Sequence, residues 1–193
     1  MKILKKILIA LGVILVIASI GIYFLPNHYS VSNSIEINKP VDVVYGQLQD
    51  FSKWGAWDPW KEKEPEAKAT FEGTAGMPGQ KMSWEGEKIG AGSMTLKWAI
   101  ANQSINSDLE FVKPFKATAK DMWKLESNGG KTTVTWTNTG GLKYPMGRLF
   151  GLSVDKMMNS EQKHGLDNLK KYVESLPDAA PVASADTTST KSM

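Results

Sequence analysis

The fold is decided by the stretch in which the spacing of apolar residues changes, residues 132–176, which reads TTVTWTNTGGLKYPMGRLFGLSVDKMMNSEQKHGLDNLKKYVESL. Val134 and Trp136 alternate with polar residues, which is the pattern of a strand with one buried face. After Pro145 the apolar residues recur largely at steps of three and four, as in an amphipathic helix. These residues are Leu149, Leu152, Met157, Leu166, Leu169, Val173 and Leu176. We therefore predict a final strand followed by one long helix from Pro145 to Leu176.

Strand-like segments fill most of the chain before this helix. Six of them are separated by short breaks rich in turn residues: AKATFEG, QKMSWEGEK, SMTLKWAIANQ, SDLEFVKPF, ATAKDMWKLES and TTVTWTNTG. A further strand is predicted over residues 29–37, and Pro40 suits the first turn of a helix that follows it. Because strands joined by tight turns pair antiparallel, we expect one antiparallel sheet of about seven strands.

The two faces of this sheet differ in polarity. Alternate positions place one set of apolar residues on the same face: Met82, Trp84, Met94, Leu96, Trp98, Ile100, Leu109, Phe111, Trp123, Leu125, Val134 and Trp136. The opposite positions are rich in lysine, threonine and glutamate. An apolar face of this kind must be covered, and the C-terminal helix is the one segment long enough to cover it. The expected fold class is therefore α+β.

Three motifs resemble one known superfamily. They are SIEINKPVDVVYGQLQDFSKWGAWDPW at 34–60, GGKTTVTWT at 129–137 and GRLFGLSVDKMMNSEQKHGLDNLKKYVE at 147–174. Each resembles a part of the polyketide cyclase/dehydrase and lipid-transport superfamily, also called SRPBCC or START-like, which includes the birch pollen allergen proteins. The resemblance implies a helix-grip fold, in which a curved antiparallel sheet wraps a long C-terminal helix around a cavity for an apolar ligand. It says little about a reaction, because the superfamily holds carriers, cyclases and hydrolase activators.

The N-terminus predicts a membrane anchor. Ile7 to Leu25 carries no charge, and 19 residues of helix span roughly 28 Å, close to a hydrocarbon core of about 30 Å. A cleaved signal peptide is the alternative, although its best small-residue site, Ser19 to Gly21, lies inside the apolar run. Lysines precede the segment and none follows until Lys39, so residues 1–26 should form a single-pass helix with its N-terminus in the cytoplasm. The domain would then be extracytoplasmic, on the periplasmic side of a bacterial inner membrane.

The other end of the chain predicts a tail. Residues 177–193 are rich in Ala, Ser, Thr, Pro and Asp and contain no aromatic residue, so we expect them to be disordered. The folded domain should then comprise residues 27–176.

Charge and residue counts exclude several classes of function. Of 23 basic residues, Lys2, Lys5 and Lys6 precede the apolar segment, which leaves 20 basic and 20 acidic residues for everything after it. We therefore expect no nucleic-acid partner. With no cysteine and two histidines, thiol catalysis, disulfides, thiolate zinc sites and histidine-rich metal sites are excluded, and we expect no cofactor and no metal.

The candidate ligand contacts lie on the apolar face of the sheet and on the long helix. They are Trp84, Leu96, Trp98, Phe111, Asp121, Trp123, Trp136 and Met157. The four tryptophans either line a cavity or form plain core, and core is the more conservative interpretation. Asp121 shares parity with Trp123, so on an apolar wall its carboxyl pKa would be raised and it could act as an acid, a base or a ligand anchor. The more conservative interpretation is that parity slips near Phe115 and leaves Asp121 in water.

The stretch FSKWGAWDPW at 51–60 carries Trp54, Trp57 and Trp60 at three-residue steps. We favour packing of these rings at one end of the fold over an exposed platform for a sugar or choline group.

Three functions remain open at this stage. The first is a non-catalytic, membrane-tethered domain that binds a lipid or other hydrophobic small molecule. The second is a cyclase- or hydrolase-like enzyme that uses Asp121 and His164 in the same cavity. The third is a protein-interaction module whose cavity is collapsed by tryptophan packing. No set of nucleophile, base and orienting residue can be assembled, which favours the first over the second.

Overall fold

The computed structural model describes residues 2–177, and the chain there forms four α-helices, one short 3-10 helix and seven strands. In chain order these are α1 Lys2–Tyr23, β1 His28–Ile37, α2 Val41–Leu48, the 3-10 helix η1 Phe51–Ala56, α3 Pro59–Lys63, β2 Lys68–Glu72, β3 Lys81–Glu85, β4 Ala91–Ile100, β5 Ser104–Lys113, β6 Ala117–Asn128, β7 Lys131–Gly141 and α4 Met146–Ser175. The predicted strands and the long C-terminal helix are confirmed.

The seven strands form one antiparallel sheet in the order β1-β7-β6-β5-β4-β3-β2. Neighbours from β2 to β7 are consecutive in the sequence, so local hairpins account for most of the pairing. β1 is the exception: it pairs with β7 from His28↔Gly141 to Ile37↔Thr132, which joins the two ends of the domain.

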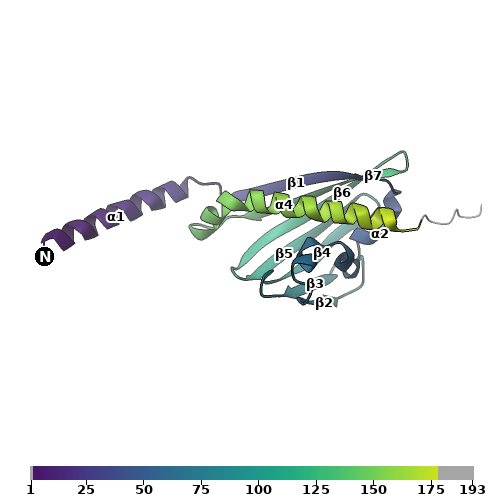
Figure 1. Ribbon diagram of the computed structural model, residues 1–193, viewed down its shortest axis with the longest axis horizontal. Helices are drawn as coiled ribbons and strands as arrows, with labels where there is room; N and C mark the ends of the chain where they lie inside the picture. The colour runs from purple at the N-terminus through teal and green to yellow at the C-terminus, as the bar shows by residue number, and fades with distance from the viewer. Residues whose placement is uncertain (1, 178–193) are drawn as a thin grey trace, which may run out of the picture.

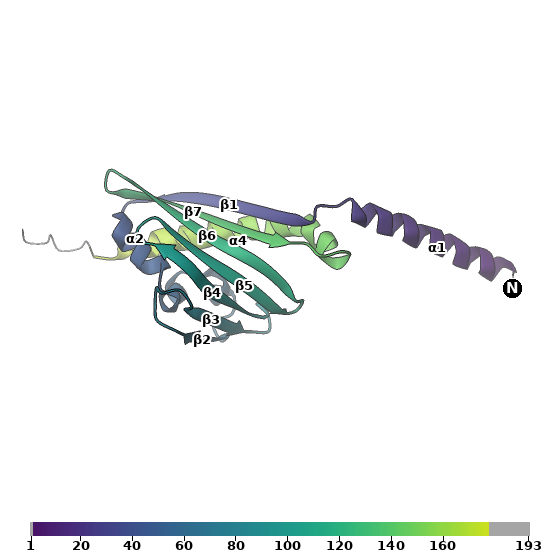
Figure 2. The ribbon, with the colours of Figure 1, turned by 180° about the vertical axis from the view of Figure 1, so that it is seen from behind.

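The long helix α4 covers the inner face of the sheet, while the outer face is open (Figures 1 and 2). Leu166, Leu169 and Val173 of α4 are buried against the sheet tryptophans Trp123 and Trp136. The helix lies close to the sheet at Gly165, where an added Cβ would be 3.2 Å from the Trp136 ring. The fold is thus an α+β helix grip, as the resemblance implies.

A bulge in β4 overturns one part of the predicted pattern. The pairing with β5 shifts between Leu96 and Trp98, so that Lys97 is an extra residue in β4. A one-residue shift exchanges the two faces of a strand. Ala99 therefore packs against the core, whereas Trp98 lies on the outer face with 42% of its surface exposed. The prediction that Trp98 and Ile100 face the interior is wrong.

The first half of α4 also departs from the predicted pattern of buried residues. Met157, predicted to line the interior, is 44% exposed, and Leu152 is 69% exposed. From residue 146 to 161, Val154 is the one buried residue of the helix. The predicted apolar residues Leu152 and Met157 therefore point away from the interior, although Val154 of the same half is buried.

The N-terminal helix α1 projects from the end of the domain at which β1 and α4 begin (Figures 1 and 2). Within residues 2–177 it is the one helix long and apolar enough to cross a membrane. The predicted tail, residues 177–193, lies outside the described residues except for Pro177.

Candidate functional site

A row of polar side chains crosses the apolar inner face of the sheet. Ser107 of β5 is directly opposite Asp121 of β6, and Asp121 is directly opposite Asn138 of β7. All three are buried. Strand pairing alone therefore places three polar groups side by side in an interior that is otherwise apolar.

Hydrogen bonds extend this row to Tyr29 of β1. The Tyr29 hydroxyl donates to Asn138 Oδ1 at 2.7 Å, and Asn138 Nδ2 donates to Asp121 Oδ1 at 2.5 Å. Gly140 makes room for the Tyr29 ring, because a Cβ at position 140 would lie 2.4 Å from it. Burial, with the nearby carboxylates of Asp121 and Asp155, raises the Tyr29 pKa to about 12, so this hydroxyl keeps its proton and acts as a donor.

Asp121 is 3% exposed, so the more conservative prediction, a carboxylate left in water by a parity slip, is wrong. Burial raises its pKa to about 6, while Asn138 and the indole of Trp136 act in the opposite direction. The Trp136 N–H interacts electrostatically with this carboxylate but does not meet hydrogen-bond geometry. Around pH 6 Asp121 is therefore present in both its charged and its neutral form.

Stacked tryptophans form the next row along the sheet. The rings of Trp123 and Trp136 are parallel within 19° at a centroid distance of 4.4 Å. Trp54 and Trp57 meet Trp123 edge to face at 5.6 and 5.9 Å. Trp60 meets Trp136 in the same way at 5.9 Å. The prediction that the 51–60 stretch packs against the fold is confirmed, and its rings fill the end of the interior.

Several buried polar atoms in this cluster have no hydrogen-bond partner among residues 2–177. They are the indole nitrogens of Trp57 and Trp123 and the hydroxyl oxygen of Ser107. Trp54 differs, because its indole donates to the Leu48 carbonyl at 3.0 Å. An unpaired buried donor costs about 1–3 kcal/mol, so such atoms mark places where a further acceptor would be stabilised.

Gln162 is a buried polar residue of α4 that binds β1. It is fully buried, accepts a hydrogen bond from Asn33 Nδ2 at 2.9 Å and lies beside the Val31 carbonyl at 3.5 Å.

The structure brings four of the eight predicted contacts into this interior: Leu96, Asp121, Trp123 and Trp136 are all buried. Trp84 and Phe111 form an edge-to-face pair at 5.9 Å and lie half-buried on its margin. Trp98 and Met157 lie elsewhere, as described above. The role of these residues as ligand contacts stays a prediction.

Sequence reasoning missed the polar residues of the site. Ser107 shares parity with Leu109, and Asn138 shares parity with Trp136, so the alternation that identified the apolar face also contains them. Tyr29 shares parity with Val31 and Ile35, and Gln162 precedes Leu166 by four residues, so the same spacing places them on the inner side. Their partners could not be predicted, because these depend on β1 pairing with β7 and on the position of α4.

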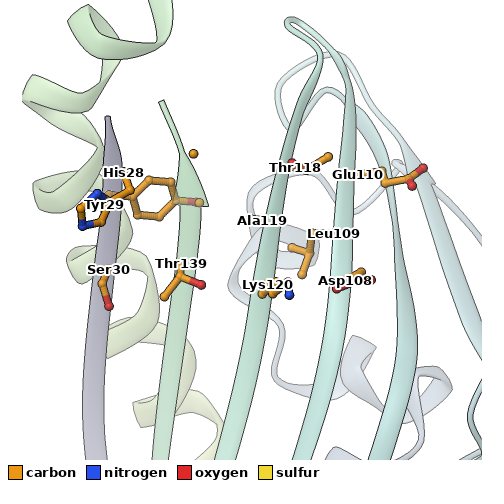
Figure 3. Close-up of a pocket in the computed structure, with 12 residues that line it drawn as sticks. His28, Tyr29, Ser30, Asp108, Leu109, Glu110, Thr118, Ala119, Lys120 and Thr139 are labelled. Carbon is orange, nitrogen blue, oxygen red and sulfur yellow. The ribbon is translucent and has the colours of Figure 1, made fainter. Parts of the chain in front are cut away.

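Two open hollows of the molecule lie outside this interior. One, of about 460 Å³, spans β1, β7, β6 and β5 at the end of the sheet near α1 (Figure 3). Its lining residues are His28, Tyr29, Ser30, Asp108, Leu109, Glu110, Thr118, Ala119, Lys120, Thr139, Gly140 and Gly141. Most of these side chains belong to the outer face. A second hollow, of about 820 Å³, lies among the loops around Glu64, Lys88 and Pro114. Neither hollow lies between the sheet and α4.

The described residues hold no group of three or more His, Cys, Asp or Glu side chains that could bind a metal. His164 is not part of the interior either: it lies on the exposed side of α4, where its Nε2 is 2.7 Å from Glu62. Asp121 and His164 therefore do not form a catalytic pair.

Residues 28–174 match the model of the family described as polyketide cyclase / dehydrase and lipid transport. Among solved structures, the chain is similar to protein CV1439 from Chromobacterium violaceum, at 14% identity and a TM-score of 0.58, covering 77% of this chain and 98% of that chain. It is also similar to the di-domain ARO/CYC StfQ from the steffimycin biosynthetic pathway, at 12% identity and a TM-score of 0.57, covering 77% and 51%. A third similar structure is Ara h 8.0201, at 10% identity and a TM-score of 0.56, covering 77% and 99%. At such identities the likeness shows the fold alone. No curated protein sequence matches the chain.

Proposed function

Because the chain belongs to the polyketide cyclase / dehydrase and lipid transport family, we propose that it binds a hydrophobic small molecule, such as a lipid, between the sheet and α4. The domain does so without catalysis, tethered by α1 to a membrane and facing the extracytoplasmic side. The observation that carries this proposal is the set of unpaired polar atoms on Trp57, Trp123 and Ser107 inside an apolar interior.

The chemistry of these atoms defines the polar end of the ligand. An indole N–H is a donor and cannot accept, so its partner must be an acceptor oxygen or nitrogen. The surrounding rings of Trp54, Trp123 and Trp136 suit an apolar body. Asp121 has a pKa of about 6 and is ionised at a pH above that value. Its charge would repel an anionic head group in this buried, low-dielectric interior. The expected ligand is therefore apolar with a neutral acceptor group, such as an ester, ketone or alcohol.

Access to this interior would come from the first half of α4. That half buries one residue, Val154, whereas the second half buries Gln162, Leu166, Leu169 and Val173. Segments with few buried contacts open at a low cost in free energy. A ligand would enter by displacing the first half of α4 while the second half stays docked.

The arrangement of Asp121 favours binding over catalysis. One carboxylate oxygen of Asp121 accepts a hydrogen bond from Asn138, and Asn138 accepts one from Tyr29. The three side chains therefore form a structural chain of hydrogen bonds, which we call the polar ladder. A catalytic base would need a reacting proton within hydrogen-bond reach and a group to activate. Asp121→Asn keeps the acceptor oxygen and should therefore preserve ligand binding.

Ligand binding to the full-length protein in detergent tests the proposal. Two probes share one acyl chain: monooleoylglycerol carries a neutral head and oleate carries a carboxylate. We expect monooleoylglycerol to quench the interior tryptophan fluorescence and to remain bound in native mass spectrometry, with weaker binding of oleate. Trp123→Phe keeps a ring but removes the donor, so affinity should fall roughly two- to tenfold. Trp98→Phe, on the outer face, is the matched control and should leave affinity unchanged.

A protein-interaction module is the second candidate, because the stacked pair of Trp123 and Trp136 and the rings of Trp54 and Trp57 already fill the interior. If neither probe binds, and the protein purified from membranes carries no extractable apolar molecule, the binding proposal is wrong and this candidate takes its place.

A further inference from the structure

The first turns of α4 carry an unusual exposed surface. Tyr144, Met146, Leu149, Phe150 and Leu152 are all large, apolar or aromatic, and exposed, and we call them the membrane-proximal face. Single exposed apolar residues are ordinary, but a contiguous group on successive turns marks an interaction surface.

The opposite side of the same turns explains why these residues point outward. Gly147 and Gly151 lie against Leu142, and an added Cβ would be 2.9 Å and 2.5 Å from it respectively. Leu142 is itself buried. The small residues of this segment therefore face the domain, and the large apolar residues face away from it.

The second half of α4 does not share this property. Its outward side carries Lys163, Asp167 and Lys171, all exposed. Lys163 is 11 residues after Leu152, which is close to three turns of helix and places the two on the same side. The change from apolar to charged along one side of one helix shows that the apolar character is local to the end near α1.

Direct contacts place this end beside α1. The Tyr144 hydroxyl donates to the Ser19 carbonyl at 3.3 Å, and the rings of Tyr144 and Tyr23 meet edge to face at 6.5 Å. Arg148 donates to the Tyr23 carbonyl, and its guanidinium carbon lies 5.2 Å from the centre of the Tyr23 ring. Both ribbon views show α4 beginning where α1 ends (Figures 1 and 2).

If α1 spans the bilayer, these contacts determine how deep Tyr144 lies in the membrane. Ser19 precedes Tyr23 by four residues, so its carbonyl lies roughly 6 Å inside the end of the helix. Amphipathic helices that lie in the membrane interface are buried by about 5–10 Å. A side chain bonded to Ser19 must therefore be at the boundary between head groups and acyl chains.

We propose that the membrane-proximal face is immersed in the bilayer interface and forms a second membrane contact beside α1. This inference rests on the proposed membrane anchor. Arg148 fits the same arrangement, because aromatic residues and arginine are favoured at the head-group level. The first half of α4, which an entering ligand would displace, then faces lipid.

The absence of cysteine from the sequence permits a direct test. Single cysteines replace Phe150, Leu152, Lys163 and Ile14 in the full-length protein, and each variant is labelled with an environment-sensitive fluorophore and placed in phosphatidylcholine and phosphatidylglycerol vesicles. Quenching by lipids that carry a nitroxide on the acyl chain reports contact with lipid. These positions are exposed, so the substitutions leave the core intact, and tryptophan fluorescence checks folding.

We expect the labels at positions 14, 150 and 152 to be quenched, with quenching at 150 and 152 about threefold or more above that at 163. Quenching at 14 together with values at 150 and 152 no higher than at 163 would leave the anchor standing and overturn this inference. No quenching at 14 would overturn the anchor and the inference with it. A blue-shifted but unquenched label at 152 would mean that protein, such as a second copy, covers this face, and would also overturn the inference.

Discussion

The buried carboxyl of Asp121 should make the stability of the protein depend on pH. Its pKa is about 6 in the folded protein, against 3.8 for an ordinary aspartate, because burial disfavours the charged form. Well below pH 4 the group is protonated in both the folded and the unfolded chain and contributes no pH dependence. Between about pH 4 and 6 the unfolded chain is ionised while the folded protein keeps its proton. The free energy of unfolding therefore falls as the pH rises through this window, and stays low above it.

The size of this effect follows from the pKa difference. It is about two pH units, and each unit corresponds to about 1.4 kcal/mol, so ionised Asp121 lowers the free energy of unfolding by about 3 kcal/mol. Asp121→Asn removes the charge but keeps an oxygen that can accept from Asn138. The variant should gain stability relative to the wild type as the pH rises from about 4 to 8, by up to about 3 kcal/mol.

Thermal unfolding of both full-length proteins in detergent, followed by tryptophan fluorescence across this pH range, measures the difference. For a domain of this size the change should be about 6–12 °C in Tm between the two ends of the range. Asp58, whose pKa burial also raises to about 6, contributes its own pH dependence to both proteins. The double variant Asp58→Asn, Asp121→Asn should therefore show the flattest profile. A stability difference between wild type and Asp121→Asn that does not change with pH would show that Asp121 is not buried as described.

Two glycine substitutions test the close contacts of the site in the same unfolding assay. Gly140→Ala places a methyl group 2.4 Å from the Tyr29 ring, so it should lower the free energy of unfolding by about 1–3 kcal/mol, whereas Gly141→Ala meets nothing within 4 Å and should have little effect. Equal effects of these two would contradict the packing of Tyr29. Gly165→Ala brings a methyl group to 3.2 Å from the Trp136 ring, so it should fail to show the gain of about 1 kcal/mol that alanine otherwise gives over glycine in a helix. A full gain would mean that α4 and the sheet are less tightly packed there.

The sequence contained enough to predict the elements and most of the inner face. Alternation over the strands and steps of three and four after Pro145 are local properties, because the backbone geometry of a strand or helix sets the period at which side chains return to one side. The burial of Trp123, Trp136 and Leu96 followed from that period alone. Parity with Trp123 also indicated burial of Asp121, but the more conservative interpretation placed it in water and was wrong.

The rest was decided by tertiary structure. One extra residue at Lys97 turned Trp98 outward, and a bulge leaves no mark in the alternation that precedes it. Met157 has helical spacing, yet it lies nine residues before Leu166, which is half a turn around the helix from the buried side, and it is exposed. The polar ladder joins Tyr29 to Asn138 across more than a hundred residues of chain. The period of the sequence determines which side chains share a face. Which of these side chains meet is decided by the register between distant strands and by the position of the covering helix. Both depend on the packing of the whole domain.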